Sequence, residues 1–112
     1  MVGLERTWRE EVRRVLAPFA AEIDAVALFG SRATGRARVN SDVDLVLHGR
    51  VTQADIDRIW TMFEESNLPV TVDLIAYSTD LPPLLKHHID ARAMPLFVRE
   101  DLLHNATMLC AA

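Results

Sequence analysis

Two kinds of hydrophobic pattern alternate along this chain. Residues 25–29 and 70–77 are short, densely apolar runs of the kind that form buried strands. Residues 4–19 and 52–63 instead carry apolar side chains at spacings of three and four, which is typical of amphipathic helices. The order along the whole chain is helix, strand, turn, strand, helix, strand, helix, strand. We therefore predict an α/β (α+β) fold in which helices flank a small mixed β-sheet.

Local signals set the expected ends of these elements. The first helix is expected from Leu4, and Pro18 should end or kink it. Residues 52–55 have the form of a capping box that would begin the second helix. The third helix is expected to start near residues 79–80, with Pro82 in its first turn. Strands are expected at 25–29, 42–47, 70–77 and 95–99, and the apolar face of the third helix is expected to comprise Leu81, Leu84, Leu85, His88 and Ile89.

Composition and charge narrow the function classes. The 112 residues suffice for a single domain, 1–112, with the patterned core at about 4–99 and a tail at about 102–112 whose structure the pattern leaves open. The net charge of −4 argues against a nucleic-acid backbone as the main partner. A single cysteine, Cys110, and the absence of a signal-peptide pattern or a long apolar run favour a cytoplasmic protein without a membrane span.

The helices carry more bulky apolar side chains than a small sheet covers. We therefore expect a partly apolar helical surface that binds a protein partner or a second copy of the chain. The residues expected to contribute are Trp8, Phe19, Trp60, Met62 and Phe63.

Two acidic residues lie two positions apart in the second expected strand. Because side chains alternate along a strand, Asp42 and Asp44 leave it on the same face. Carboxylates that close repel each other unless a cation lies between them, and oxygen ligands suit Mg²⁺. An isolated Asp-x-Asp pair is also compatible with a solvated strand edge.

A glycine and a serine close the strand before this pair. Gly30 allows another backbone or a ligand to approach closely, and the Ser31 hydroxyl with nearby N–H groups suits phosphate oxygens. Arg32 adds a possible bidentate donor to the same anion. An ordinary strand-ending turn would have the same sequence.

A third aspartate and several histidines complete the set of candidates. Asp73 lies inside the strand at 70–77, where a carboxyl group requires a metal ion or a cationic partner such as Arg32 or Arg92. His88 falls on an apolar helix face, which favours a core or interface histidine over a metal ligand. His48 shares a strand face with the acidic pair.

At this point the residues resemble a known family. Gly30-Ser31, ten further residues and then Asp42-Val43-Asp44 form a pattern similar to that of the DNA polymerase beta-like nucleotidyltransferase superfamily. The fuller string at 28–45 resembles its minimal nucleotidyltransferase branch, and Val72-Asp73-Leu74 resembles the third acidic position. The resemblance extends over most of the chain to about Arg99.

The resemblance implies a Mg²⁺-dependent enzyme that transfers a nucleoside monophosphate from ATP or another NTP to a hydroxyl group and releases pyrophosphate. By the same resemblance, Asp42, Asp44 and Asp73 are catalytic and hold two Mg²⁺ ions, while Gly30, Ser31 and Arg32 bind the nucleotide. Minimal members often act as antitoxins paired with a HEPN-domain toxin, so a protein acceptor modified with AMP is expected. Two alternatives stay open: a non-catalytic antitoxin that occludes its partner, and a transferase acting on a small molecule or an RNA end.

Overall fold

The structure is a computed structural model, and its labelled elements include four strands and four α-helices. The described residues are 6–35, 38 and 41–103. In chain order the elements are α1 (Arg6–Leu16), the short 3₁₀ helix η1 (Ala17–Phe19), β1 (Ile23–Phe29), α2 (Ser31–Thr34), β2 (Val43–Gly49), α3 (Gln53–Glu64), β3 (Val72–Ala76), α4 (Pro83–Arg92) and β4 (Met94–Val98). Residues 99–103 are also helical.

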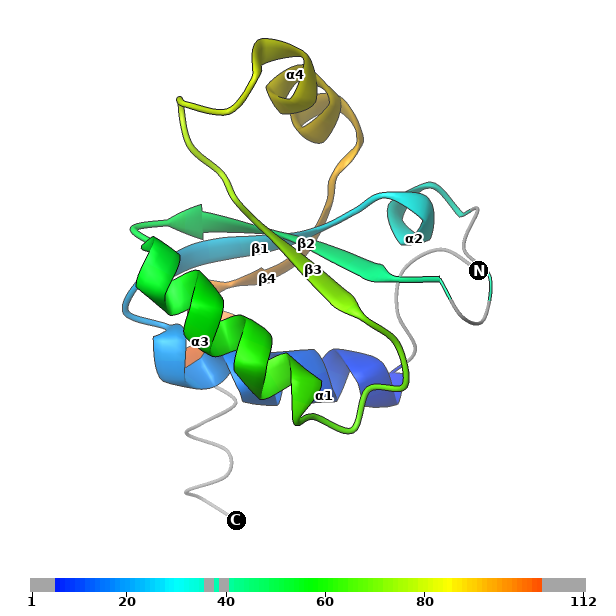
Figure 1. Ribbon diagram of the computed structural model, residues 1–112, viewed down its shortest axis with the longest axis vertical. Helices are drawn as coiled ribbons and strands as arrows, with labels where there is room; N and C mark the ends of the chain where they lie inside the picture. The colour runs from blue at the N-terminus through cyan, green and yellow to red at the C-terminus, as the bar shows by residue number, and fades with distance from the viewer. Residues whose placement is uncertain (1–5, 36–37, 39–40, 104–112) are drawn as a thin grey trace.

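The sheet is mixed, as the sequence predicts. Its strand order is β3-β2-β1-β4 (Figure 1). β1 pairs antiparallel with both β2 and β4, whereas β2 and β3 run parallel. The parallel pair is possible because α3 connects its two strands as a crossover.

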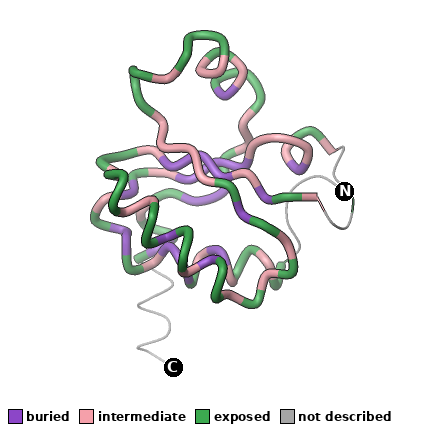
Figure 2. Tube along the Cα trace, in the orientation of Figure 1, coloured by how far each residue is buried: buried purple, intermediate pink, exposed green. Residues whose placement is uncertain are grey.

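Helices cover both faces of the sheet, but unequally. α1 and α3 pack on one face, and α4 lies on the other (Figure 1). The main core fills the first face and includes Leu16, Leu45 and Ile59, while a small cluster of Ala27, Val46 and Ile89 lies under α4. Buried residues follow the strands and the inner sides of α1 and α3 (Figure 2). The face under α4 is therefore the more open one, and it has room for polar side chains.

The helix signals are mostly confirmed. α1 ends at Leu16, and η1 follows with Pro18 in its first turn. The capping box at the start of α3 is complete, since the Asp55 N–H donates to Thr52 Oγ1 at 3.1 Å and the Thr52 N–H donates to Asp55 Oδ2 at 3.0 Å. The expected start at Leu4 and the residues beyond 103 lie outside the described residues.

The predicted start of the third helix is wrong by a few residues. α4 begins at Pro83, not near residues 79–80. A residue that precedes proline is disfavoured in the helical conformation, so neither Leu81 nor Pro82 can join the helix. The predicted apolar face is also incomplete, because Leu84 is 69% exposed while Ile89 is buried.

The expected apolar surface is largely absorbed into the core. Phe19 and Phe63 are buried, so the prediction is wrong for these two residues. Trp8 and Met62 are half-buried against the core. Trp60 alone of the five is well exposed, at 44%. None of the described helices has the length and apolar character needed to cross a membrane.

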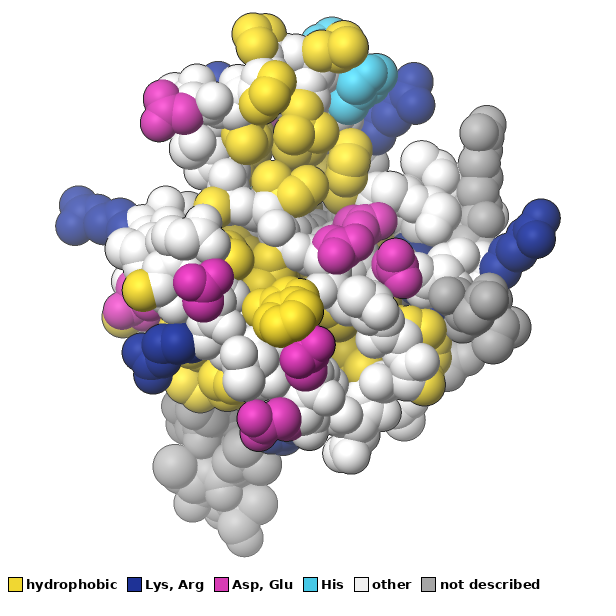
Figure 3. Space-filling view, viewed as in Figure 1, with side chains coloured by type: hydrophobic (Ala, Val, Ile, Leu, Met, Phe, Trp, Pro, Cys, Tyr) yellow, Lys and Arg dark blue, Asp and Glu magenta, His cyan; other side chains and the backbone are white. Residues whose placement is uncertain are grey.

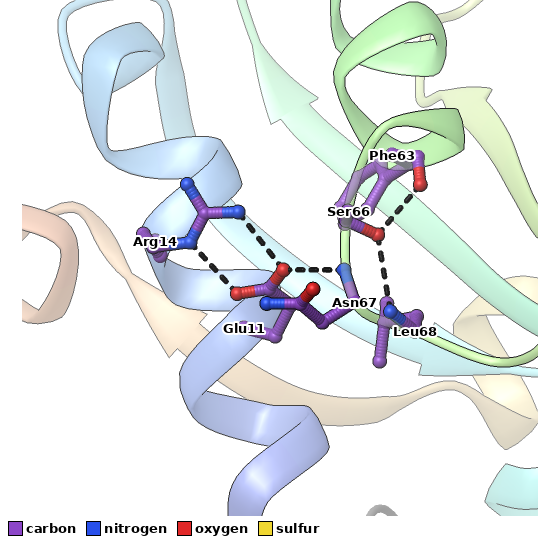
Figure 4. Close-up of polar contacts among 6 residues, drawn as sticks. All are labelled: Glu11, Arg14, Phe63, Ser66, Asn67 and Leu68. Carbon is purple, nitrogen blue, oxygen red and sulfur yellow. Dashed lines mark hydrogen bonds and ion pairs between the residues drawn. The ribbon is translucent and has the colours of Figure 1, made fainter.

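A carboxylate ties α1 to the turn that follows α3. Glu11 accepts hydrogen bonds from Arg14 at 2.7 and 2.8 Å and from the Asn67 backbone N–H at 2.7 Å (Figure 4). The hydrogen bonds from Arg14, together with that from Asn67, lower the pKa of Glu11 from 4.5 to about 2 against the opposing effect of burial. The ionised carboxylate is thus favoured in the folded state.

We expect Glu11→Gln to lower the free energy of unfolding at pH 7 by about 1 kcal/mol, because the substitution weakens charge-assisted hydrogen bonds. The folded pKa lies below the unfolded one, so the stabilisation is present above pH 4.5 and is lost as the pH falls towards 2. Urea unfolding of both proteins at pH 7 and pH 3 measures this difference. Glu10→Gln is the control, because Glu10 is exposed and lies 3.7 Å from Arg13, and it should change little. Equal effects of the two substitutions would contradict the assigned role of Glu11.

Candidate active site

The register of the sheet brings three carboxyl groups together on the face under α4. Asp44 in β2 lies opposite Asp73 in β3 and opposite Phe29 in β1. Val46, two residues after Asp44, packs in the small cluster with Ile89 of α4, so Asp44 leaves the strand on that same face. Asp42 lies immediately before β2 and is exposed, as is Asp73. Acidic side chains are visible beside the apolar side chains of α4 (Figure 3).

The environment of Asp44 disfavours its charged form. Burial, followed by the negative charge of Asp73, a hydrogen bond with the Asp73 side chain and the charge of Asp42, raises the pKa of Asp44 from 3.8 to about 6. The three aspartates therefore repel one another, and a cation would relieve that repulsion.

The donor chemistry of this cluster fits Mg²⁺. Within the described ranges no group of three or more His, Cys, Asp or Glu side chains is arranged to hold a metal ion. Mg²⁺, however, is usually held by one or two carboxylates together with water and substrate phosphates, not by an all-protein cage. Neighbouring Asp44 and Asp73, with Asp42 beside them, supply such a partial set of oxygen ligands.

The turn between β1 and α2 needs a glycine for two reasons. Gly30 has φ 72° and ψ −151°, a conformation that other residues rarely adopt. A Cβ at this position would also collide with Asp44 Oδ2 and lie 3.2 Å from Asp44 Cγ. The Gly30 backbone thus lies directly against the carboxyl group of Asp44.

A cavity of about 660 Å³ opens beside this turn. Its walls are formed by the end of β1, the α2 turn and one side of α4, through Phe29, Gly30, Ser31, Thr34, His88 and Arg92. The Ser31 hydroxyl is half-buried and forms no hydrogen bond with another described residue. The cavity is thus bordered by the glycine and serine that the sequence singles out and adjoins Asp44.

Arg32, which is expected to bind a phosphate, is engaged in contacts within the protein. The side chain is buried, donates from Nη2 to the Ser41 carbonyl oxygen at 2.8 Å, and places its guanidinium carbon 4.7 Å from the centre of the Trp8 ring. A weaker contact reaches the Arg38 carbonyl oxygen at 3.5 Å. Arg32 therefore connects α1 to the segment that leads into Asp42.

We expect Arg32→Lys to lower the free energy of unfolding by about 1–2 kcal/mol. Lysine keeps the charge but loses the planar group that stacks on Trp8 and donates to the Ser41 carbonyl. Chemical unfolding followed by Trp8 fluorescence, in a Trp60→Phe background, reports both the stability and the indole environment. Arg50→Lys is the control, since Arg50 is exposed after β2 and should change less. Unchanged stability together with unchanged Trp8 emission would contradict this role of Arg32.

Two residues of the cavity, His88 and Arg92, were not assigned to a site from the sequence. The sequence indicates a core or interface role for His88 and offers Arg92 only as a partner of Asp73. No ion pair joins Asp73 to Arg32 or Arg92 in the described part of the chain. Their spacing of four on α4 was the available signal, because such residues share a helix face. His48 lies elsewhere, stacked on Tyr77 with ring centres 4.5 Å apart.

The family model described as Polymerase beta, Nucleotidyltransferase matches residues 10–102. No curated protein matches the sequence. Among solved structures, one described as the crystal structure of a toxin-antitoxin with AMP-PNP is similar in fold, with a TM-score of 0.67 and 16% sequence identity over 92% of this chain and 87% of that chain.

Proposed function

We propose a function for this chain from the premise that it belongs to the polymerase beta nucleotidyltransferase family, whose model spans most of its length. The chain is a minimal nucleotidyltransferase that transfers AMP from ATP to a hydroxyl group and releases pyrophosphate. The observation that carries this proposal is the juxtaposition of Asp44, Asp73 and Asp42 with the Gly30-Ser31 turn and its adjoining cavity.

Each side chain has a role that its position supports. Asp42, Asp44 and Asp73 would hold Mg²⁺, which when bound neutralises phosphate charge and aligns the attacking and leaving oxygens. Gly30 and Ser31 would contact the β- and γ-phosphates from the edge of the cavity. Asp73, which is exposed, would accept the proton of the acceptor hydroxyl. The bond between the acceptor oxygen and the α-phosphorus forms as the bond from that phosphorus to the α–β bridging oxygen breaks, and pyrophosphate leaves.

The acceptor we propose is a protein toxin with a HEPN domain, modified on a tyrosine hydroxyl and thereby neutralised. The structure similar in fold is described as a toxin-antitoxin with AMP-PNP, an ATP analogue, which supports a toxin as the partner and ATP as the nucleotide. The resemblance of the Gly-Ser and Asp-x-Asp motifs to minimal nucleotidyltransferases that act as antitoxins supports the same role.

The test uses the purified chain, the product of the neighbouring gene, Mg²⁺ and ATP labelled at either the α- or the γ-phosphate. We expect label from the α-phosphate on the partner protein and label from the γ-phosphate in pyrophosphate, with both lost in Asp73→Asn. Asp80→Asn is the matched control, since Asp80 is exposed in the turn before α4 and is not part of the cavity wall. A stable complex without label would instead show a binding module that acts by occlusion. Label on RNA or on a small molecule would overturn the protein acceptor.

A further inference from the structure

We propose that Arg92, assisted by His88, binds the β- and γ-phosphates of the nucleotide from the α4 side of the cavity and so selects triphosphates over monophosphates. This inference rests on the proposed function, because it assigns the phosphate chain to the cavity beside Gly30 and Ser31. The cationic contact to the phosphates is thereby assigned to Arg92, which is remote in sequence, and not to Arg32, which follows Ser31 directly.

The pairing of β1 with β4 places Arg92 next to the Gly30 turn. Leu28 and Met94 are partners in this antiparallel pair. Continuing the same register by two residues brings position 92 opposite position 30, just beyond the end of the strands. Arg92 and Gly30 are indeed both among the residues that line the cavity. The position of Arg92 thus follows from the sheet as well as from α4.

Arg92 is available for an anion. It is exposed at the last turn of α4, and no hydrogen bond or ion pair involves its side chain within the described ranges. Among the residues lining the cavity, Arg92 and His88 are those whose side chains can carry positive charge. They lie four residues apart and so project from the same side of the helix. A planar guanidinium group pairs with two phosphate oxygens at once, which suits a β- or γ-phosphate.

Arg32 cannot serve in this way without giving up its present contacts. Its guanidinium group is stacked on Trp8 and bonded to the Ser41 carbonyl oxygen. Both contacts lie on the side of α2 that leads to α1 and to Asp42, and Arg32 is absent from the cavity wall. The phosphate chain therefore needs a cation from another element.

The two ends of the site carry opposite charge. Asp73, Asp44 and Phe29 follow one another across β3, β2 and β1, and Arg92 continues this order beyond β1. Phe29 and Gly30, at the end of β1, therefore lie between Asp44 and Arg92. A nucleotide whose phosphates extend from the carboxylates towards α4 would have its far phosphates next to Arg92. AMP, which lacks those phosphates, would not reach the arginine.

The test compares binding of an ATP analogue with a methylene bridge between its α- and β-phosphorus atoms, which cannot be transferred, with binding of AMP. Isothermal titration calorimetry with Mg²⁺ on the full chain measures both affinities. We expect Arg92→Gln to weaken binding of the analogue about 10–100-fold, the usual range for losing a hydrogen-bonded charge pair, and to leave AMP binding unchanged. Arg92→Lys should recover part of the loss, and His88→Gln should have a smaller effect than Arg92→Gln.

The matched control is Lys86→Gln, which removes one positive charge from the same helix. Lys86 lies over the Tyr77 ring, 5.8 Å from its centre, and is not part of the cavity wall. Three outcomes would each overturn the role of Arg92 while leaving the transferase intact. In the first, Arg92→Gln and Arg92→Lys bind the analogue as tightly as the wild type does. In the others, Lys86→Gln weakens analogue binding as much as Arg92→Gln does, or Arg92→Gln weakens AMP binding as much as analogue binding. A wild-type protein that binds neither nucleotide would overturn the proposed function as well.

Discussion

Asp44→Asn is expected to reduce nucleotidyl transfer at least about 10³-fold and to leave the metal-free protein as stable as the wild type or more so, by about 1 kcal/mol at pH 8. The loss of transfer follows because a metal-bound phosphate site is worth several kcal/mol of transition-state stabilisation, with about 1.4 kcal/mol for each factor of ten. The gain in stability follows from the half-buried carboxyl group, whose pKa is raised to about 6 by burial and by Asp73. Solvent screening of the half-exposed carboxyl group keeps this gain small.

The raised pKa of Asp44 also determines how the free energy of unfolding changes with pH. The folded pKa of about 6 lies above the unfolded value of 3.8, so the folded state binds the proton first. The stabilisation is therefore fully present below pH 3.8 and is lost as the pH rises to about 6. Asp44→Asn should remove this slope. Unfolding of both proteins in urea without metal, at several pH values from 4 to 8, measures it.

Ligand binding supplies the complementary measurement. Mg²⁺ with ATP at a hundredfold excess over the dissociation constant should stabilise the wild type by about 2.7 kcal/mol, and Asp44→Asn should lose most of that gain. Asp80→Asn serves as the control and should keep it, because Asp80 is exposed in the turn before α4. A metal-free Asp44→Asn protein much less stable than the wild type would show instead that Asp44 is a structural hydrogen-bonding residue.

Gly30→Ala is expected to reduce transfer about 100-fold and to lower the free energy of unfolding by about 1–3 kcal/mol. The substitution places alanine at φ 72°, a conformation that residues other than glycine rarely adopt. The added methyl group would also overlap Asp44 Oδ2 and displace the Asp44 carboxyl group. A shift of the Asp44 carboxylate by about 1 Å is enough to misalign a metal site. Transfer assays and thermal unfolding measure the two effects.

A double-mutant cycle separates backbone strain from the clash. Asp44→Ala removes Oδ2 and Cγ and leaves only its Cβ, which would lie 3.6 Å from the new methyl group, an ordinary contact. Gly30→Ala should therefore cost about 1–2 kcal/mol less in the Asp44→Ala background than in the wild type. Equal costs in the two backgrounds would show that φ strain alone explains the effect, and that Gly30 and Asp44 are not in contact.

The features that could be predicted from the sequence depend on residues within a few positions of one another. The capping box at Thr52 and Asp55 spans one helical turn, and α3 begins where it predicts. The strand content of 25–29 and 70–77 was predictable because burial on both faces leaves a continuous apolar run. The start of α4 is also determined locally, because Pro82 and Pro83 disfavour the helical conformation in the residues that precede them.

The partners of the site residues required the tertiary structure. Spacing along a strand determines that Asp42 and Asp44 leave it together, but only the parallel pairing of β2 with β3 determines that Asp73 lies beside Asp44 and raises its pKa. Arg32 is adjacent to Ser31 in the chain, yet its long side chain is directed to Trp8.

Arg92 is remote in sequence, and the β1–β4 pairing places it by the cavity. The sequence alone therefore determined which residue types carry the chemistry and which of them share a face. The packing of distant elements decided which of those side chains meet, because strand pairing and layer order depend on burying whole apolar faces and not on local spacing.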